Sequence, residues 1–301
     1  MRDTTYVGFH TGTWGRGRRT DADAVATLRL ALNGYDWDIP SRRAPLGFTG
    51  NTLHPEILDR TVFEWFFSTI MFTRHVIGVD AAFGWPTGFR SFIDGVLPDP
   101  MPTNDDIIKN PILYREGERF IYELLDVLPK SVLDYADSTT KAQAVIGILK
   151  KRVGAHVAFT GRSESGRWCE LDTIVVETSP QFAEYDPAFK RNRIELFADI
   201  NRTLKAQGKP SLKNVEKAAL SSALIAMGID QAICNPGDGD SYYVVPSGML
   251  PIGDRASGEG SDLFFAWKCN PSLFKGEGFA SFPISRKVQE KVAKRKKVRA
   301  D

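Results

Sequence analysis

The chain is poor in cysteine and histidine and carries almost no net charge. Its 301 residues include three cysteines and four histidines, and the formal charge at pH 7 is +2. The cysteines (Cys169, Cys234 and Cys269) are widely spaced and odd in number. This pattern fits neither a disulfide framework nor a zinc site, so we expect plain buried or half-buried thiols. The small net charge excludes a protein that is a polycation over its whole surface.

Long hydrophobic runs and internal repeats are also missing. No apolar run approaches the roughly 20 residues that cross a bilayer. The start of the chain, MRDTTYVGFH, has no secretory apolar region behind its first charge. We therefore expect a cytoplasmic protein without a membrane segment. No clear linker divides the chain, because residues 100–111 are short enough to be an insertion, so we expect one domain over residues 1–285 and a basic tail over residues 286–301.

Apolar periodicity and turn residues predict strands that alternate with helices. Strands are expected at residues 4–9, 35–39, 75–80, 173–176 and 242–245, and residues 24–33 fit a strand or a short helix. Helices are expected at residues 56–71, 87–95, 114–128, 139–152, 187–206 and 212–227. This order indicates an α/β fold.

Two of the expected strands end on an acid. The stretch VIGVDAAFGWP stops an apolar run at Asp80, and TIVVETSP ends a later strand on Glu177. Burying an ionised carboxylate without a partner is costly, so we expect both acids at the open ends of their strands. Strand ends of this kind are where α/β sheets bind their ligands. The sequence thus predicts one edge of the sheet lined with carboxylates.

Four segments, in the same order, resemble a prokaryotic family of predicted nucleases with a ribonuclease H-like fold. VIGVDAAFGWP resembles that family's strand and loop "IDAPLGWP", and residues 114–119 (YREGER) are similar to its "R-x-T-D-R" helix start. Residues 175–180 (VVETSP) resemble its "VVETYP" strand end, and residues 219–226 (ALSSALIA) its small-residue helix "ALVCALVA". The similarity extends from about residue 75 to 245, and residues 1–74 match less well.

This resemblance implies a mixed sheet flanked by helices, with helical insertions, and a metal-dependent hydrolysis of phosphodiesters. Carboxylates at the strand ends and on the last helix would hold two divalent metal ions, Mg²⁺ or Mn²⁺, which neutralise the attacking and leaving oxygens. In this sequence Asp80 and Glu177 would be the metal ligands and catalytic acids. Arg115 or Arg119, with Glu118 beside them, would bind a phosphate or orient these acids.

Two positions depart from the family pattern. In the family the first strand normally ends in Asp, whereas here it ends in His10. The last helix of the family also carries an Asp, and the corresponding position here is Ala218. Histidine suits transition metals better than Mg²⁺, so His10 is a candidate substitute ligand or base. Either Asp21, Asp23 or Glu216 replaces the missing acids from nearby, or the metal site is degenerate.

Simpler interpretations stand beside these. Asp80 fits a residue that caps the following loop by accepting backbone N–H groups, and the arginines of residues 114–119 fit a solvated helix surface. His10 fits an ordinary loop or core histidine. His54, His75 and His156 lie far apart in sequence, and nothing indicates that they meet.

The Gly-rich segment HTGTWGRGRR, residues 10–19, supports two competing functions. Small residues after a first strand can close on a phosphate, as in sugar kinases and actin-like ATPases, but the Asp of their "D-x-G-T-T" pattern and a Walker motif are missing. Alternatively, Arg16, Arg18 and Arg19 would contact phosphates and Trp14 would stack on a base, in a non-catalytic module that binds nucleic acid or a protein partner. The tail, with eight Lys or Arg, would reinforce such a contact. We expect a nuclease first and a binding module second.

Overall fold

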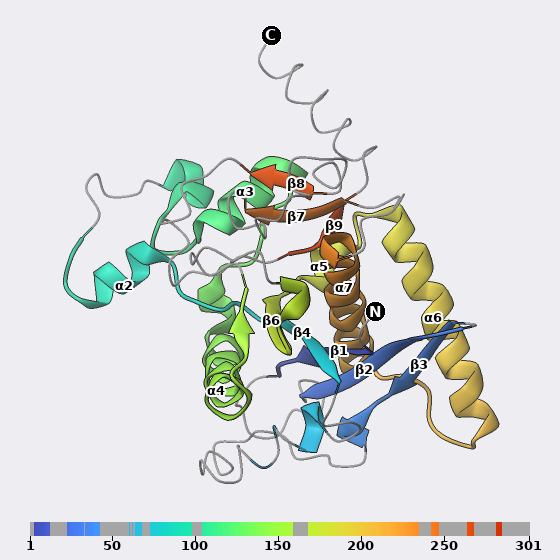
Figure 1. Ribbon diagram of the computed structural model, residues 1–301. Coiled ribbons are helices and arrows are strands. Elements are labelled where there is room, and N and C mark those ends of the chain that lie inside the picture. Colours follow the sequence, from blue (N-terminus) through green and yellow to red (C-terminus); the bar gives the residue numbers. More distant parts are fainter. Residues whose placement is uncertain are drawn as a thin grey trace.

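A computed structural model gives the fold of the chain (Figure 1). It describes residues 3–12, 23–32, 34–42, 60, 62, 64–67, 73–97, 104–158, 168–234, 242–246, 264–267 and 281–284. The Gly-rich segment from residue 13 and the basic tail, with Trp14, Arg16, Arg18 and Asp21, lie outside the described residues. Of the helix expected at residues 56–71, residues 60, 62 and 64–67 are described, and all of them except residue 67 are helical.

A mixed sheet of six strands forms the centre of the molecule, in the order β3-β2-β1-β4-β6-β5. The pairs β1–β2 and β2–β3 are antiparallel, whereas β1, β4, β6 and β5 run parallel to one another. The strands are β1 (Thr4–His10), β2 (Ala24–Ala31), β3 (Gly34–Asp38), β4 (Arg74–Asp80), β5 (His156–Val157) and β6 (Thr173–Glu177). Parallel strands need long crossovers, and the connection from β4 to β5 contains the helices α2 (Thr87–Ile93), α3 (Glu116–Leu125) and α4 (Ala136–Val153). The expected α/β class is confirmed.

Helices cover both faces of this sheet, and each face has its own hydrophobic core. Successive residues of a strand point to opposite faces, so Tyr6 and Val76 belong to one core while Val7 and Ile77 belong to the other. The first core is covered by α3 (Glu116–Leu125), α5 (Pro180–Ala183), α6 (Pro187–Ala206) and α7 (Asn214–Cys234). On the opposite face, α4 (Ala136–Val153) covers the second core (Figure 1). Val62, Trp65, Phe66 and Phe67 belong to the same core. The near-continuous apolar runs of β1, β4 and β6 follow from this burial on both faces.

Small residues bring α7 very close to β1 and β4. At Gly8 an added Cβ would lie 1.7 Å from the carbonyl oxygen of Ala219, and at Gly78 it would lie 2.4 Å from that of Ser222. The small-residue run at residues 219–226 therefore serves the packing of this helix on the sheet. Among the described residues, α7 is also the one helix long and apolar enough to cross a membrane, but 67% of that window is buried within the protein.

The remaining elements are short. A second sheet has the order β8-β7-β9, from β7 (Tyr242–Pro246), β8 (Phe264–Trp267) and β9 (Pro283–Ile284). The helix α2 (Thr87–Ile93) has no buried residue and projects away from the sheet (Figure 1). Short 3₁₀ helices complete the described chain: η2 (Pro40–Arg42), η4 (Asn104–Lys109), η5 (Val132–Tyr135) and η6 (Trp168–Glu170).

Two of the three cysteines form a disulfide, so the expectation of free thiols is wrong for them. Cys169 in η6 is bonded to Cys234, the last residue of α7, with Cα atoms 5.6 Å apart. The two residues lie 65 positions apart in sequence. Sequence spacing could not reveal this pair, because the fold alone brings the end of α7 to the segment before β6. Cys269 lies outside the described residues.

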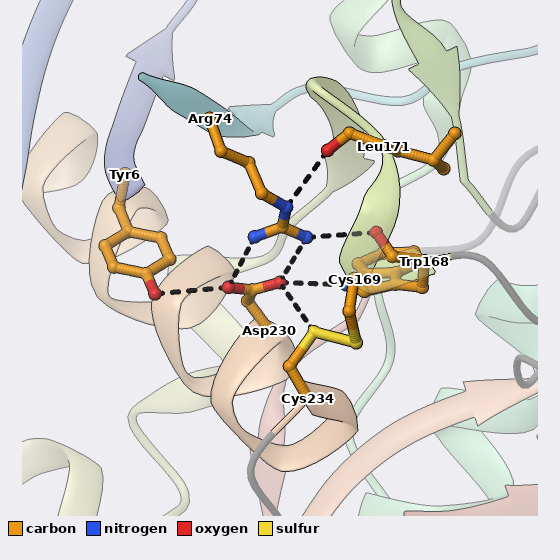
Figure 2. Close-up of a disulfide and its surroundings, with 7 residues drawn as sticks. All are labelled: Tyr6, Arg74, Trp168, Cys169, Leu171, Asp230 and Cys234. Carbon is orange, nitrogen blue, oxygen red and sulfur yellow. Dashed lines mark hydrogen bonds and ion pairs between the residues drawn. A yellow bond between two sulfur atoms is a disulfide. The ribbon is translucent and has the colours of Figure 1, made fainter. Parts of the chain in front are cut away.

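A buried ion pair adjoins the disulfide (Figure 2). The guanidinium of Arg74 donates to both oxygens of Asp230, at 2.7 Å each, and Asp230 lies one helical turn before Cys234. Tyr6 Oη and Trp168 Nε1 also donate to this carboxylate, at 3.1 and 2.9 Å. Every one of these charged and polar groups has a partner, as buried groups require. The amino ends of β1 and β4 are thereby joined to α7.

Candidate functional site

The carboxyl ends of three neighbouring parallel strands meet in one pocket. β1 ends at His10, β4 at Asp80 and β6 at Glu177, and the strand register pairs His10 with Asp80 and Val79 with Glu177. The pocket has a volume of about 370 Å³ and is lined by all three of these strand-end residues. The convergence expected from the strand ends is therefore present, on one edge of one sheet.

His10 and Asp80 form a close pair at the mouth of this pocket. The distance from His10 Nδ1 to Asp80 Oδ2 is 2.7 Å, and the two side chains are 25% and 28% exposed. The hydroxyl of Thr11 donates to the backbone carbonyl of Asp80 at 3.4 Å. The acid that ends β4 thus has a partner on the neighbouring strand, and that partner is a histidine, the residue type most often used in general acid–base catalysis.

Deeper in the pocket, one arginine lies between two glutamates. Arg115 Nη2 donates to Glu177 Oε1 at 2.6 Å and Nη1 donates to Glu177 Oε2 at 3.0 Å, while Nε donates to Glu118 Oε1 at 3.1 Å. The backbone N–H of Phe83 adds a fourth hydrogen bond, to Glu177 Oε2 at 2.8 Å. All three charged side chains are at most 7% exposed. This cluster is called the Arg115 triad (Arg115, Glu118 and Glu177).

The start of α3 fixes the geometry of the triad. Arg115 is the residue before the helix, and its backbone N–H donates to Glu118 Oε2 at 2.8 Å, as in a capping box. Burial lowers the pKa of Arg115, but the neighbouring Glu177 and Glu118 carboxylates outweigh this effect and raise it overall. Burial raises the pKa of Glu118 to about 7, against the opposing effect of Arg115.

A second buried ion pair joins α4 to Asp23, the residue before β2, and Asp23 in turn holds Gly12. Lys141 Nζ donates to Asp23 Oδ1 at 2.8 Å, and the backbone N–H of Gly12 donates to the same oxygen at 2.8 Å. Ser138 Oγ donates to the carbonyl of Thr11 at 3.1 Å. These contacts hold the backbone of Thr11 and Gly12, directly after His10, in place.

The acids do not fit the two-metal arrangement that the family resemblance implies. Both oxygens of Glu177 are occupied by Arg115, Asp23 is paired with Lys141, and Glu216 is paired with Arg42. Ala218 does line the pocket, so the position of the missing helix acid is where the resemblance implies, without a ligand side chain. Over the described parts of the chain, no group of three or more His, Cys, Asp or Glu side chains could hold a metal ion.

The other predicted residues are placed apart from the pocket or outside the described chain. Arg119 donates to Glu116 at 2.9 Å and to the carbonyl of Tyr114 at 3.3 Å, and it does not line the pocket. His75 is buried, which lowers its pKa to about 4. His156 lies on β5. Trp14, Arg16, Arg18 and His54 are not described.

Sequence reasoning missed a contribution from the far C-terminal part of the chain. Ser281 forms a parallel bridge with Thr178, and its backbone N–H donates to the carbonyl of Glu177 at 2.9 Å. Phe282 is fully buried and packs against Phe182, with ring centroids 5.6 Å apart. The segment of Ser281 and Phe282 is too short to show a periodic pattern, so the sequence could not predict this contact.

Fold and pocket together define an α/β protein with a polar pocket at the carboxyl ends of its parallel strands. No family model, no curated protein and no solved structure matches the chain. The family resemblance therefore stays a prediction.

Proposed function

We propose that the pocket is the active site of a phosphodiester hydrolase with a ribonuclease H-like fold, and that His10 is its base. The observation that carries this proposal is the 2.7 Å contact between His10 and Asp80 at the open ends of neighbouring parallel strands. Open α/β sheets bind their ligands at this edge. The mixed sheet with helices on both faces agrees with the architecture that the resemblance implies.

The chemistry uses the chain's own groups. With the Asp80 carboxylate as acceptor, the proton of a neutral His10 resides on Nδ1, and Nε2 is the basic nitrogen. Nε2 takes a proton from water, whose oxygen bonds to phosphorus while the P–O bond to the leaving group breaks. The leaving oxygen keeps the electron pair of that bond and takes up a proton from solvent, and the His10 imidazolium later returns its proton to solvent. Asp80 orients the ring and stabilises the imidazolium that forms, as a carboxylate does beside a catalytic histidine.

The pocket also limits the shape of the substrate. Its volume of about 370 Å³ is at the small end of ligand pockets, which suits one nucleotide rather than a duplex. Lys130 is exposed and lines the pocket, so it supplies a positive charge for a phosphate at the entrance. We therefore expect a single-stranded or terminal nucleotide as the substrate.

Cleavage assays with matched variants test the proposal. Single- and double-stranded RNA and DNA are offered to the wild type with Mg²⁺, with Mn²⁺ and with a chelator. We expect His10→Gln to lower the cleavage rate by about 10²–10⁴-fold, the usual worth of a general base, and Asp80→Asn to lower it as well. His156→Gln, at a half-buried histidine outside the pocket, is the control and should cleave like the wild type. Full activity of His10→Gln, with folding checked by circular dichroism, would remove His10 from the mechanism.

A non-catalytic binding module is the second candidate. It is favoured by His10 and Ala218, which stand in the pocket where the resemblance implies acids. In that case the wild type cleaves none of the substrates but retains nucleic acid on a filter at about 50 mM salt, and loses it steeply as salt rises.

A further inference from the structure

The Arg115 triad is a buried cluster in which two acids surround one fixed positive charge. Glu177 is 2% exposed and receives two hydrogen bonds from the guanidinium, and Glu118 receives a third. The arginine comes from the start of α3, 62 residues before Glu177. Both residues line the same pocket as His10 and Asp80.

Physical chemistry explains why such a cluster needs its cation. A buried carboxylate without a partner is strongly destabilising, and a divalent metal or an arginine can each supply the missing positive charge. Arginine supplies it as a planar fork that matches both oxygens of a carboxylate. The distances of 2.6 and 3.0 Å to Glu177 have this two-bond form.

A metal ion on Glu177 would compete with this arrangement. Three hydrogen bonds already end on its two oxygens, two from Arg115 and one from the Phe83 N–H. A divalent ion on the same carboxylate would lie within a few ångströms of the guanidinium, and two positive charges at that separation repel strongly in a buried site. Glu177 thus has its cation built into the chain.

We infer that Arg115 takes the place of a metal ion at Glu177, so that the pocket binds no divalent ion there while Arg115 is present. This inference rests on the proposed function, which identifies the pocket as an active site, and it adds how the charge of Glu177 is balanced there. The positive charge beside Glu177 is supplied by α3, and phosphodiester chemistry in this pocket proceeds without a metal ligated by Glu177.

Manganese titration of the wild type and matched variants tests the inference without any substrate. Free Mn²⁺ is followed by electron paramagnetic resonance. The Mn²⁺ affinity of the wild type should be unchanged by Glu177→Gln. Arg115→Met leaves two acids facing an uncharged side chain and removes the charge that would repel the ion, so it should bind Mn²⁺ about tenfold or more tightly than the wild type. The double variant Arg115→Met/Glu177→Gln should lose that gain. Arg119→Met, on the same helix but paired with Glu116, is the control and should resemble the wild type.

Two results would overturn the inference: weaker Mn²⁺ binding by Glu177→Gln than by the wild type, or no gain in a folded Arg115→Met variant. If the variants do not fold, wild-type crystals soaked in Mn²⁺ decide the matter. An anomalous peak within about 2.5 Å of a Glu177 oxygen contradicts the inference, and a map without one supports it. Because no nucleic acid is present, these outcomes are independent of whether the protein cleaves a phosphodiester.

Discussion

The two strand-end acids of the pocket, Asp80 and Glu177, are each paired with a residue from a different element. Asp80 on β4 meets His10 of β1, and Glu177 on β6 meets Arg115 before α3. The same holds for the pairs Asp23–Lys141 and Arg42–Glu216. The buried pairs Arg115–Glu177 and Asp23–Lys141 are costly to break, because removing one partner leaves a buried charge uncompensated. The pair of Arg115 and Glu177 fixes the start of α3 relative to β6.

Glu118 should make the stability of the protein depend on pH. Its pKa is about 7 in the folded protein against an ordinary value of 4.5, with Arg115 and Glu177 facing it. Between these values the folded state binds a proton that the unfolded state releases, so stability falls as pH rises. Relative to Glu118→Gln, the wild type should lose up to about 3 kcal/mol of unfolding free energy across this window.

Urea unfolding of both proteins at about pH 5 and about pH 7.5 measures this difference, and other titrating groups cancel in the comparison. Glu116→Gln, on the same helix and paired with Arg119, controls for the introduction of an amide. The free energy of unfolding of the wild type minus that of Glu118→Gln should fall as pH rises. A value that stays constant or increases between the two pH values would contradict the assignment.

At the same scale, sequence showed the acids but not all their partners. Asp80 and Glu177 stood out because each ends an apolar strand, and a histidine at the end of β1 could be placed beside them. The bond between Arg115 and Glu177 spans 62 residues, and that between Asp23 and Lys141 spans 118. A partner so distant is decided by the packing of whole helices on the sheet, which local patterns do not encode. For the same reason the disulfide was missed.

At the scale of elements, long periodic segments were predictable and short ones were not. The helix expected at residues 187–206 has these bounds in the structure, because Asp186 accepts from the Phe189 N–H at its start and Pro187 is the first helical residue. The pattern of residues 24–33 fitted either a strand or a short helix. In the structure this segment forms β2, which pairs with β1. The two-residue strands β5 and β9 and the four-residue α5 were not expected, since each contains too few residues for a periodic pattern to repeat.

The contact of α7 with the sheet predicts a sharp difference between glycines. Gly8→Ala and Gly78→Ala place a methyl group within 1.7 and 2.4 Å of backbone oxygens of α7, so the helix must shift. We expect each to cost about 3 kcal/mol of unfolding free energy, at the upper end of overpacking effects. Thermal and urea unfolding measure this cost.

Gly147 in α4 is the matched control. Nothing lies within 4 Å of a Cβ added there, so Gly147→Ala should instead stabilise the helix by up to about 1 kcal/mol. Equal effects at all three glycines would show that α7 does not approach the sheet as closely as described.

At the scale of the whole molecule, α7 connects two different regions. Ala218 near its start lines the pocket, and Cys234 at its end carries the disulfide to η6. Arg74 and Asp230 lie beside that disulfide, at the amino end of β4 and on the last turns of α7 (Figure 2). The polar groups of the pocket are thus held at one end of the sheet while the other end is closed by a covalent bond and a buried ion pair.

The disulfide should contribute strongly to stability. It closes a loop with a sequence separation of 65 residues, and the loss of chain entropy in the unfolded state corresponds to about 4 kcal/mol. A Cys269→Ser background leaves only this pair to react. In that background, Cys169→Ser/Cys234→Ser should unfold at a lower urea concentration, with a free energy of unfolding smaller by about 4 kcal/mol. Adding a thiol reductant should lower the stability of the parent to a similar level, and leave the double variant unchanged.

Thiol labelling of the denatured parent should find no free cysteine before reduction and two after it. Two free thiols before reduction would show that the bond does not form, and would agree with the expectation of a cytoplasmic protein, since disulfides persist mainly in oxidising compartments.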